Sequence, residues 1–447
     1  MRASRNIYKD EVDFTALALQ SPDFAKQYVQ PNATCAFPSA LKSSSLKSNG
    51  QLDFSDPDAV RQLTKSLLQR DFELKVEFPE NRLCPPVPNR LNYILWLQDL
   101  LDTTGDEYRD NYDPDREVIG LDIGTGCCSI YPLLGCYMRP HWRFIATDID
   151  NDNIKTSRET VSANKLDSRI EIIQTDPKDD LISLDTKLKV DRLDFTMCNP
   201  PFYATRDELI TSAEAKERPP FSACTGAEVE MVTTGGEIAF ITRMIEESLH
   251  LRERVIWYTT MLGKLSSVSV LIETLLEHKN KNYAVTEFIQ GNKTRRWAIA
   301  WSWTDLRPTV TVARGTSAIP KHLLPFPSEY IFITQSESLD EVSAKIDAEL
   351  TSLHIQWLWR KNLTTGVGFA MQNVWSRQAR RKMQNPDAMA DKATIDETNA
   401  ALGFKVQLKK DPIDEKGVRV IIRWLKGSDT VLFESFCGML KRKVEGK

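Results

Sequence analysis

The order of hydrophobic and polar positions along the chain separates three regions. In the first, up to about residue 117, apolar residues recur at helical spacing in residues 14–29, 56–71 and 90–97. Asp56 and Pro57 supply an N-cap and a first-turn proline for the second of these stretches. Residues 1–117 are therefore predicted to form an N-terminal arm and a helical extension that packs on the next region.

From residue 118 the pattern alternates between short apolar runs and amphipathic stretches. The runs predict buried strands and the stretches predict helices, in alternation. A final pair of runs has no helix between its members and predicts an antiparallel hairpin at the sheet edge. The order predicts an α/β domain over residues 118–306, with a doubly wound parallel sheet covered on both faces. The predicted strands are 118–123, 142–147, 170–174, 193–198, 255–260, 283–289 and 297–303, and the predicted helices are 128–138, 151–164, 237–250 and 264–279.

A smaller α+β unit is predicted over residues 320–447. Its polar segment, residues 377–398, has the composition of a mobile loop. The remaining pattern predicts strands at 331–334, 355–359, 405–409 and 418–425, and helices at 339–352 and 430–443.

Composition and charge narrow the classes of protein. The 447 residues predict two or three domains, and 41% hydrophobic with 27% charged residues is typical of a globular protein. The net charge of −4 divides unevenly: residues 321–447 carry 20 Lys and Arg against 16 Asp and Glu, and the rest carries 38 against 46. The basic C-terminal part weakly indicates a polyanionic partner.

Several classes are disfavoured. No apolar run reaches the roughly 18 residues of a membrane helix, and no apolar signal core follows the N-terminus, so we expect a soluble, intracellular protein. Eight cysteines without a C-x-x-C pair and five scattered histidines argue against a zinc site or a disulfide framework, and no metal is expected.

The segment from Asp122 to Gly126, with Gly124, Thr125 and Gly126 at the end of the first predicted parallel strand, indicates a ligand site. Glycines there let the backbone approach a ligand, and the missing third glycine favours a nucleoside over a pyrophosphate. Asp148, at the end of the second strand, is placed to accept hydrogen bonds from ribose hydroxyls. A tight turn would also explain the glycines, and a helix cap would also explain Asp148.

The strongest motif follows the strand 193–198 and consists of Asn199, Pro200, Pro201 and Phe202. It resembles the Asn-Pro-Pro-aromatic motif of class I S-adenosylmethionine-dependent methyltransferases that modify exocyclic or side-chain amide nitrogens. The Asn199 side-chain oxygen and the Pro200 carbonyl can accept hydrogen bonds from a target NH2 and align it for methyl transfer. The prolines stiffen the loop, and Phe202, with Tyr203, offers a ring face to a flipped base.

With further segments, the chain resembles the eukaryotic U6 small nuclear RNA N6-adenosine methyltransferase family, the methyltransferase-like protein sixteen type, and we expect a fungal member. The resemblance implies a Rossmann-like class I fold with S-adenosylmethionine contacts at Arg90, Gly124, Asp148 and Asn199. Relatives have Glu at the position of Asp148, and a family threonine contact falls at Asp179. The agreement covers about the first 300 residues, including residues 5–10, 87–94, 122–126, 130–135, 199–202, 235–237, 257–258, 261–264 and 296–298.

The resemblance also implies RNA contacts. The family's N-terminal arm binds RNA, which assigns Arg5 and Lys9 to that role. Vertebrate relatives carry an additional α+β RNA-binding domain that the C-terminal unit resembles. Phosphate contacts of this kind raise affinity without specifying sequence, and ordinary surface ion pairs are the alternative. The other candidate RNA contacts are Arg218, Arg295, Arg296, Arg360, Lys361, Arg377, Arg380, Arg381, Lys382, Lys409, Lys410, Arg423, Lys441, Arg442 and Lys443.

The implied activity is methylation of the N6 atom of one adenosine in structured RNA, U6 small nuclear RNA first of all. The nucleus is the expected location, with the cytoplasm as a second one. Two enzymes with the same motif stay open as alternatives: a ribosomal RNA adenine methyltransferase and a protein glutamine methyltransferase. An alternative of another class is an RNA-binding splicing cofactor for which methyl transfer is dispensable.

Overall fold

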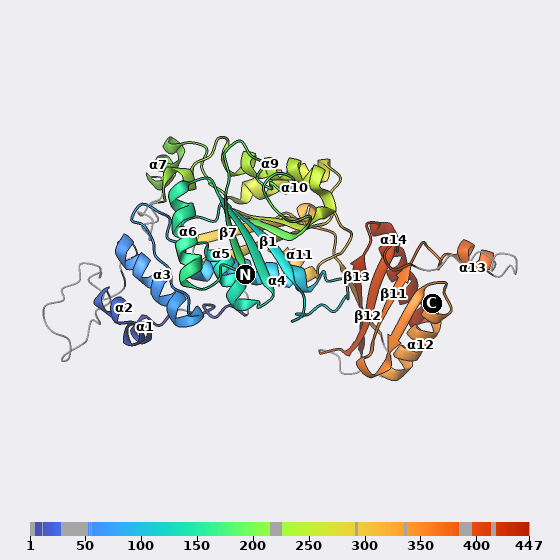
Figure 1. Cartoon of the computed structure of the whole chain (residues 1–447). Helices are drawn as coiled ribbons and strands as arrows, with labels where there is room; N and C mark the ends of the chain where they lie inside the picture. Colours follow the sequence, from blue (N-terminus) through green and yellow to red (C-terminus); the bar gives the residue numbers. More distant parts are fainter. Residues whose placement is uncertain are drawn as a thin grey trace.

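The computed structural model describes residues 5–10, 12–27, 52, 54, 56–214, 226–290, 294–334, 338–383, 396–412 and 417–446. Two units lie side by side in it (Figure 1). The larger is built on an eight-stranded sheet, and the smaller, near the C-terminus, on a five-stranded sheet. None of the helices in the described residues is long and apolar enough to cross a membrane.

The described residues of the N-terminal extension form four helices: α1 (Phe14–Gln20), α2 (Pro22–Gln27), α3 (Pro57–Phe72) and α4 (Val87–Asp102). The prediction of a single helix over residues 14–29 is wrong, because Ser21 is extended, with φ −124° and ψ 99°. Ser21 precedes Pro22, and proline disfavours the helical conformation in its predecessor. The predicted N-cap of α3 is confirmed, since the Asp56 carboxylate accepts a hydrogen bond from the Asp58 amide.

The larger sheet has the strand order β3-β2-β1-β4-β5-β7-β6-β8. The first five strands run parallel, and the hairpin β6–β7 is antiparallel, as predicted. The hairpin inserts β7 beside β5, and the two-residue β8 forms the edge beyond β6. The strands are β1 (Val118–Ile123), β2 (Trp142–Asp148), β3 (Ile170–Gln174), β4 (Leu193–Cys198), β5 (Val255–Leu262), β6 (Tyr283–Gln290), β7 (Thr294–Trp301) and β8 (Arg314–Gly315).

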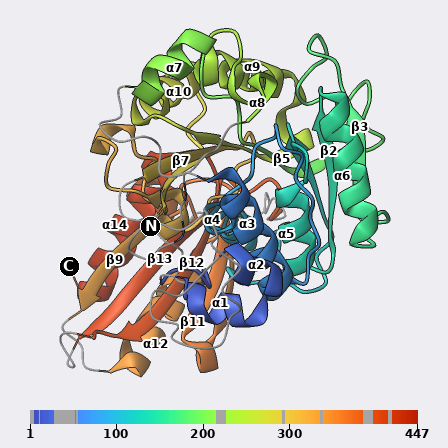
Figure 2. The same cartoon turned by 90° about the vertical axis from the view of Figure 1, so that its left-hand side faces the viewer.

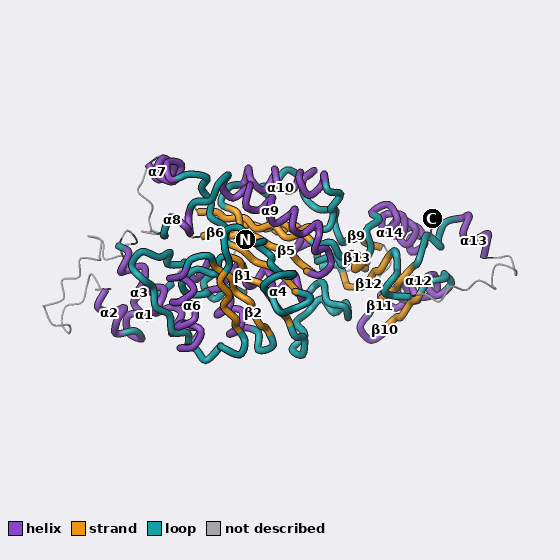
Figure 3. Tube along the Cα trace, turned by 45° about the horizontal axis from the view of Figure 1, so that its top comes forward, coloured by secondary structure: helices purple, strands orange, loops and turns teal. Residues whose placement is uncertain are grey.

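Helices cover both faces of this sheet (Figures 1 and 3). One face carries α4, α5 (Ile130–Met138), α6 (Asn151–Ala163) and α11 (Val310–Ala313), and the other carries α9 (Gly236–Leu251) and α10 (Leu265–Glu277). Successive residues of β5 point to opposite faces, so Trp257 belongs to the first core while Tyr258 stacks on Trp301 in the second. Two short helices, α7 (Arg206–Glu214) and α8 (Glu228–Met231), precede α9.

The smaller unit is an antiparallel sheet in the order β10-β11-β12-β13-β9 with α12 and α14 on one face (Figure 2). Strand β11 was not predicted, and the predicted loop at 377–398 is wrong at its start, where α13 forms; residues 384–395 lie outside the described residues. The elements are β9 (Glu329–Thr334), α12 (Leu339–Thr351), β10 (Gln356–Arg360), β11 (Thr365–Ala370), α13 (Arg377–Met383), β12 (Leu402–Lys410), β13 (Val418–Lys426) and α14 (Thr430–Glu445).

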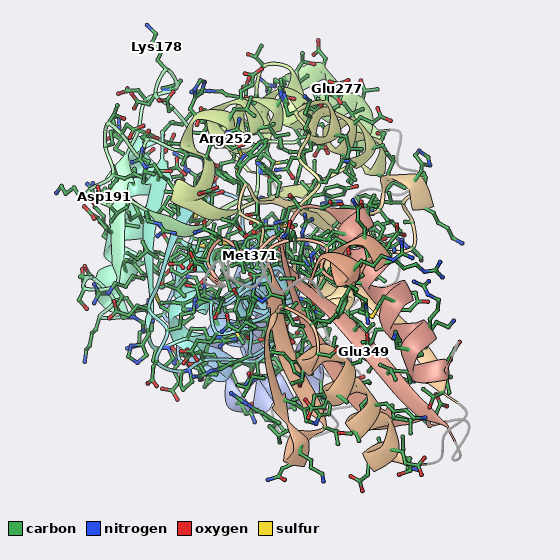
Figure 4. All side chains as sticks on the ribbon, turned by 90° about the vertical axis from the view of Figure 1, so that its right-hand side faces the viewer. Lys178, Asp191, Arg252, Glu277, Glu349 and Met371 are labelled. Atoms are coloured by element: carbon green, nitrogen blue, oxygen red, sulfur yellow. The ribbon has the colours of Figure 1, made fainter. Side chains whose placement is uncertain are left out.

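The two units meet through buried arginines and a loop that leads into β1. The Arg307 backbone amide donates to the Leu425 carbonyl at 2.8 Å, and its Nε donates to the Gly427 carbonyl at 2.8 Å. Lys405 of β12 pairs with Asp110 of the loop at 2.9 Å. The smaller unit therefore docks at the edge where the parallel strands begin; Figure 4 shows it from its outer side, with Glu349 labelled on α12.

Candidate active site

Two glycines shape the loop that follows β1. Gly124 and Gly126 have φ values of 70° and 69°, a left-handed conformation that residues with a Cβ rarely adopt. The Gly124 and Thr125 amides both donate to the Thr147 carbonyl of β2 at 2.9 Å. The Thr125 hydroxyl donates to Asp122 Oδ2 at 2.7 Å, so this carboxylate stabilises the turn from behind. The loop is thus fixed, with its glycine faces open for a close ligand contact.

Asp148 lies at the end of β2, next to this loop. Its Oδ2 accepts the Gly126 amide at 2.9 Å, and its Oδ1 accepts the Asp150 amide at 2.9 Å. The interpretation of Asp148 as the cap of α6 is wrong, because Asp150 is the N-cap residue and accepts from the Asp152 and Asn153 amides. Burial raises the pKa of Asp148. Asp148 lines the cavity described below.

The motif after β4 presents a buried, unsatisfied oxygen. Asn199 Oδ1 has no hydrogen-bond partner. The following residues are held by pairing with a neighbouring segment: the Tyr203 amide donates to the Met231 carbonyl at 3.1 Å, and the Thr233 amide donates to the Tyr203 carbonyl at 2.9 Å. The Arg296 guanidinium lies 5.3 Å from the centroid of the Phe202 ring, a cation–π contact.

These strand ends enclose one cavity of about 230 Å³. Seven of the eight predicted cofactor residues line it, together with Pro200 and Pro201, while Asp122 lies directly behind the glycine loop. Sequence reasoning missed several lining residues because no motif marks them and most come from segments distant in the sequence; only the proline-dense run before α4 gave a signal. The missed residues include Leu83, Pro85, Tyr131, Asn153, Glu230, Phe240 and Arg243.

The buried polar atoms fit the ends of S-adenosylmethionine. Arg90 donates from Nη1 to the Tyr131 hydroxyl at 3.0 Å, while its buried Nε has no partner and suits a carboxylate. Asp122 Oδ1, behind the glycine loop, is likewise buried without a partner. Buried polar groups are nearly always paired, so the unpartnered Arg90 Nε and Asn199 Oδ1 suit polar groups of a bound ligand.

Asp179 lines the same cavity, but its carboxylate is engaged elsewhere. It pairs with Lys187, which holds the pKa of Asp179 below its usual value, and it accepts the Asp176 amide at 2.6 Å. Arg243 of α9 donates to the Asp179 carbonyl. The Asp179 carboxylate is therefore not oriented toward the cofactor site in this structure, and its direct cofactor contact stays a prediction.

The predicted RNA contacts fall into different settings. Arg5 pairs with Asp99 of α4 and donates to the Leu95 carbonyl, so it anchors the arm to the extension. Arg295 pairs with Glu287 at 3.0 Å. Arg296 and Tyr203 lie beside Phe202. Lys9, Arg381 and Arg442 are exposed, whereas Arg380 and Lys441 form ion pairs. Arg218 and the Lys382 side chain lie outside the described residues.

This sheet order, glycine loop and cavity define a class I methyltransferase. Residues 2–305 match the family described as "RNA methyltransferase". The U6 small nuclear RNA (adenine-(43)-N(6))-methyltransferase of Schizosaccharomyces pombe is 37% identical over 400 residues, 89% of this chain and 96% of that protein. The RNA N(6)-adenosine-methyltransferase mettl16 of Danio rerio is 33% identical over 98% of this chain and 96% of that protein.

Similar solved structures are also of METTL16 proteins. The hMettl16 catalytic domain in complex with MAT2A 3'UTR hairpin 1 has a TM-score of 0.56 and 38% identity, covering 68% of this chain and 95% of that one. The N-terminal domain of human METTL16 in complex with SAH has a TM-score of 0.53 and 37% identity, covering 68% of this chain and 98% of that one. The chain belongs to this RNA methyltransferase family, and its methyl donor is S-adenosylmethionine.

Asp122 gives the ligand-free protein a distinctive pH dependence. Burial raises the pKa of its carboxyl from 3.8 to about 7, so folding favours the protonated form. Protonation of Asp122 therefore adds to the free energy of unfolding, and this contribution is fully present below pH 4. As the pH rises from 4 to 7 the contribution is lost, and the free energy of unfolding falls by at most about 4 kcal/mol. We expect Asp122→Asn to remove that loss, measured by denaturant unfolding between pH 4 and 8. An unchanged pH profile would contradict the raised pKa.

Proposed function

We propose that the chain transfers the methyl group of S-adenosylmethionine to the N6 atom of a flipped adenosine in structured RNA, and that U6 small nuclear RNA is its substrate. The observation that carries the proposal is the unsatisfied Asn199 Oδ1, buried at the cavity that Pro200 and Pro201 also line, with Phe202 next in the same loop. An acceptor and a ring face at this position suit an exocyclic amino group on a planar base.

The chain's own residues have distinct roles in this proposal. Asn199 Oδ1 and the Pro200 carbonyl orient the amino group, and the two prolines hold these acceptors in place. The ring of Phe202 stacks on the base, with Arg296 behind it. Arg90, Gly124, Asp148 and the neighbouring cavity residues hold the methyl donor, whose bound form supplies an electrophilic methyl group beside Asn199.

Substrate and place follow from the relatives. The S. pombe relative methylates adenine 43 of U6 small nuclear RNA, and we assign the corresponding adenosine as the target here. An enzyme acting on this RNA works in the nucleus. We further propose that residues 1–117 extend the catalytic domain (118–306) and that residues 320–447 grip the RNA, with the exposed Arg381 and Arg442 as its phosphate contacts.

The test is a methyl-transfer assay with labelled S-adenosylmethionine. Purified protein is expected to label a U6 transcript at least about tenfold faster than unrelated structured RNAs, and not a U6 transcript whose target adenosine is replaced by guanosine. Equal labelling of ribosomal RNA would overturn the U6 assignment. Labelling of RNA-free protein would favour a glutamine methyltransferase instead.

A further inference from the structure

A buried carboxylate outside the cavity fixes the segment that follows β5. Glu237, in the first turn of α9, is only 3% exposed. Its Oε2 accepts the Gly263 amide at 2.6 Å, and its Oε1 accepts the Lys264 amide at 3.1 Å. Both oxygens of the carboxylate are thus used to set the path of the backbone just after Leu262, the last residue of β5.

The segment held in this way is the support for the Phe202 ring. A Cβ atom at Gly263 would lie 3.1 Å from Phe202 Cδ1 and 3.2 Å from Glu237 Oε2, so the ring packs directly against the glycine backbone. The Phe202 backbone is supported similarly, since a Cβ at Gly236 would lie 3.5 Å from the Phe202 carbonyl oxygen. Arg296 contacts the same ring.

A second connection joins the segment after Phe202 to the same segment after β5. Lys264 Nζ pairs with Glu208 Oε1 at 2.7 Å, and Glu208 Oε2 accepts the Ala204 amide at 2.7 Å. Glu208 therefore links the residue after Tyr203 to Lys264, while Glu237 holds the same segment from the start of α9. Because this second pair is solvent-exposed, the buried Glu237 is the stronger of the two restraints.

We infer that Glu237 is a positioning residue of the methyl-transfer site: by fixing Gly263 it sets the plane of Phe202 on which the target base stacks. The inference rests on the proposed function, because it concerns the base that this function places on the ring. Stacking on an aromatic side chain is worth about 5-fold to 150-fold per base, and a tilted ring would forfeit part of it.

Two variants disturb the support by different means. Glu237→Gln replaces one acceptor with an amide NH2 that faces a backbone N–H, and Gly263→Ala pushes a methyl group against the ring edge. Gly263 has no positive φ, so alanine fits its backbone. Matched controls are Glu246→Gln, an exposed residue of the same helix, and Gly438→Ala, where the nearest atom to a new Cβ lies at 3.5 Å.

Both variants are expected to lower kcat/KM for RNA by about 10-fold to 100-fold, with the dissociation constant for S-adenosylhomocysteine unchanged within about twofold, and the controls should match the wild type. A parallel loss of S-adenosylhomocysteine affinity would overturn the assignment, since it would indicate general damage to the site. If Glu237→Gln does not fold, Gly263→Ala alone decides.

The decisive measurement adds Phe202→Ala to each variant. If Glu237 acts through the ring, Glu237→Gln in the Phe202→Ala background causes almost no further loss. Multiplicative losses would overturn the inference and assign Glu237 a separate role. Failure of the wild type to methylate RNA would instead refute the proposed function, so the two failures are distinguishable.

Discussion

Replacing Asn199 by alanine is expected to lower kcat by about 100-fold to 1,000-fold, because the variant loses an acceptor preset for the group that reacts. The side-chain oxygen is buried and unsatisfied, so no other protein contact depends on it. RNA affinity should change by less than about threefold, since phosphate contacts provide most of it. Single-turnover rates and equilibrium RNA binding, measured on the same transcript, separate the two effects.

A suitable control for this variant is Asn151→Ala. Asn151 is an exposed residue at the start of α6, and its side-chain oxygen accepts a hydrogen bond from Gln174 at 2.7 Å. It should leave turnover unchanged. A loss of RNA affinity as large as the loss of turnover in Asn199→Ala would contradict the assigned role and indicate that the loop has collapsed.

Replacing Arg423 by methionine is expected to destabilise the protein by about 3–5 kcal/mol, the usual effect of breaking a buried ionic network. Arg423 is 4% exposed and donates to the Trp424 and Arg307 carbonyls, and its Nη2 lies 3.8 Å from Asp110 Oδ1. The prediction of Arg423 as an RNA phosphate contact is therefore wrong. Burial lowers the pKa of Arg423, in keeping with its dry surroundings. Methionine would fill part of the space but leave those acceptors without a donor.

The measurement is denaturant unfolding followed by tryptophan fluorescence, since Trp424 lies within this network. Arg360→Met, at an exposed position of β10, should change stability by less than about 0.5 kcal/mol. An equally small effect for Arg423→Met would show that the contact between the two units contributes little to stability.

Elements built from local signals were predictable. The strands of the larger sheet are short apolar runs bounded by turn residues, and their order predicted the parallel sheet. Strand β11 escaped prediction because it contains Gly366 and Gly368, and glycine is depleted in strands. The reason for these glycines is tertiary: the rings of Trp357 and Phe404 occupy the space that their side chains would need.

The candidate site was predictable for a related reason. The carboxyl ends of parallel strands meet at one edge, so Gly124, Asp148 and Asn199 were expected together, and they line one cavity. Glu230 and Arg243 reach the cavity from helices that no spacing rule connects to it. The pairing of Arg5 with Asp99 was equally invisible, because 94 positions separate the two residues.

The docking of the smaller unit at the edge where the strands begin limits the size of RNA that can engage the whole protein. Asn199 and Phe202 lie beyond the opposite ends of those strands, and a six-residue strand such as β1 spans about 20 Å. A short oligonucleotide that fills the cavity is not expected to reach the smaller unit as well. If residues 320–447 grip the RNA as proposed, only an RNA whose folded part extends along the side of the catalytic unit contacts both units, and we expect weaker binding of small fragments that carry the same adenosine.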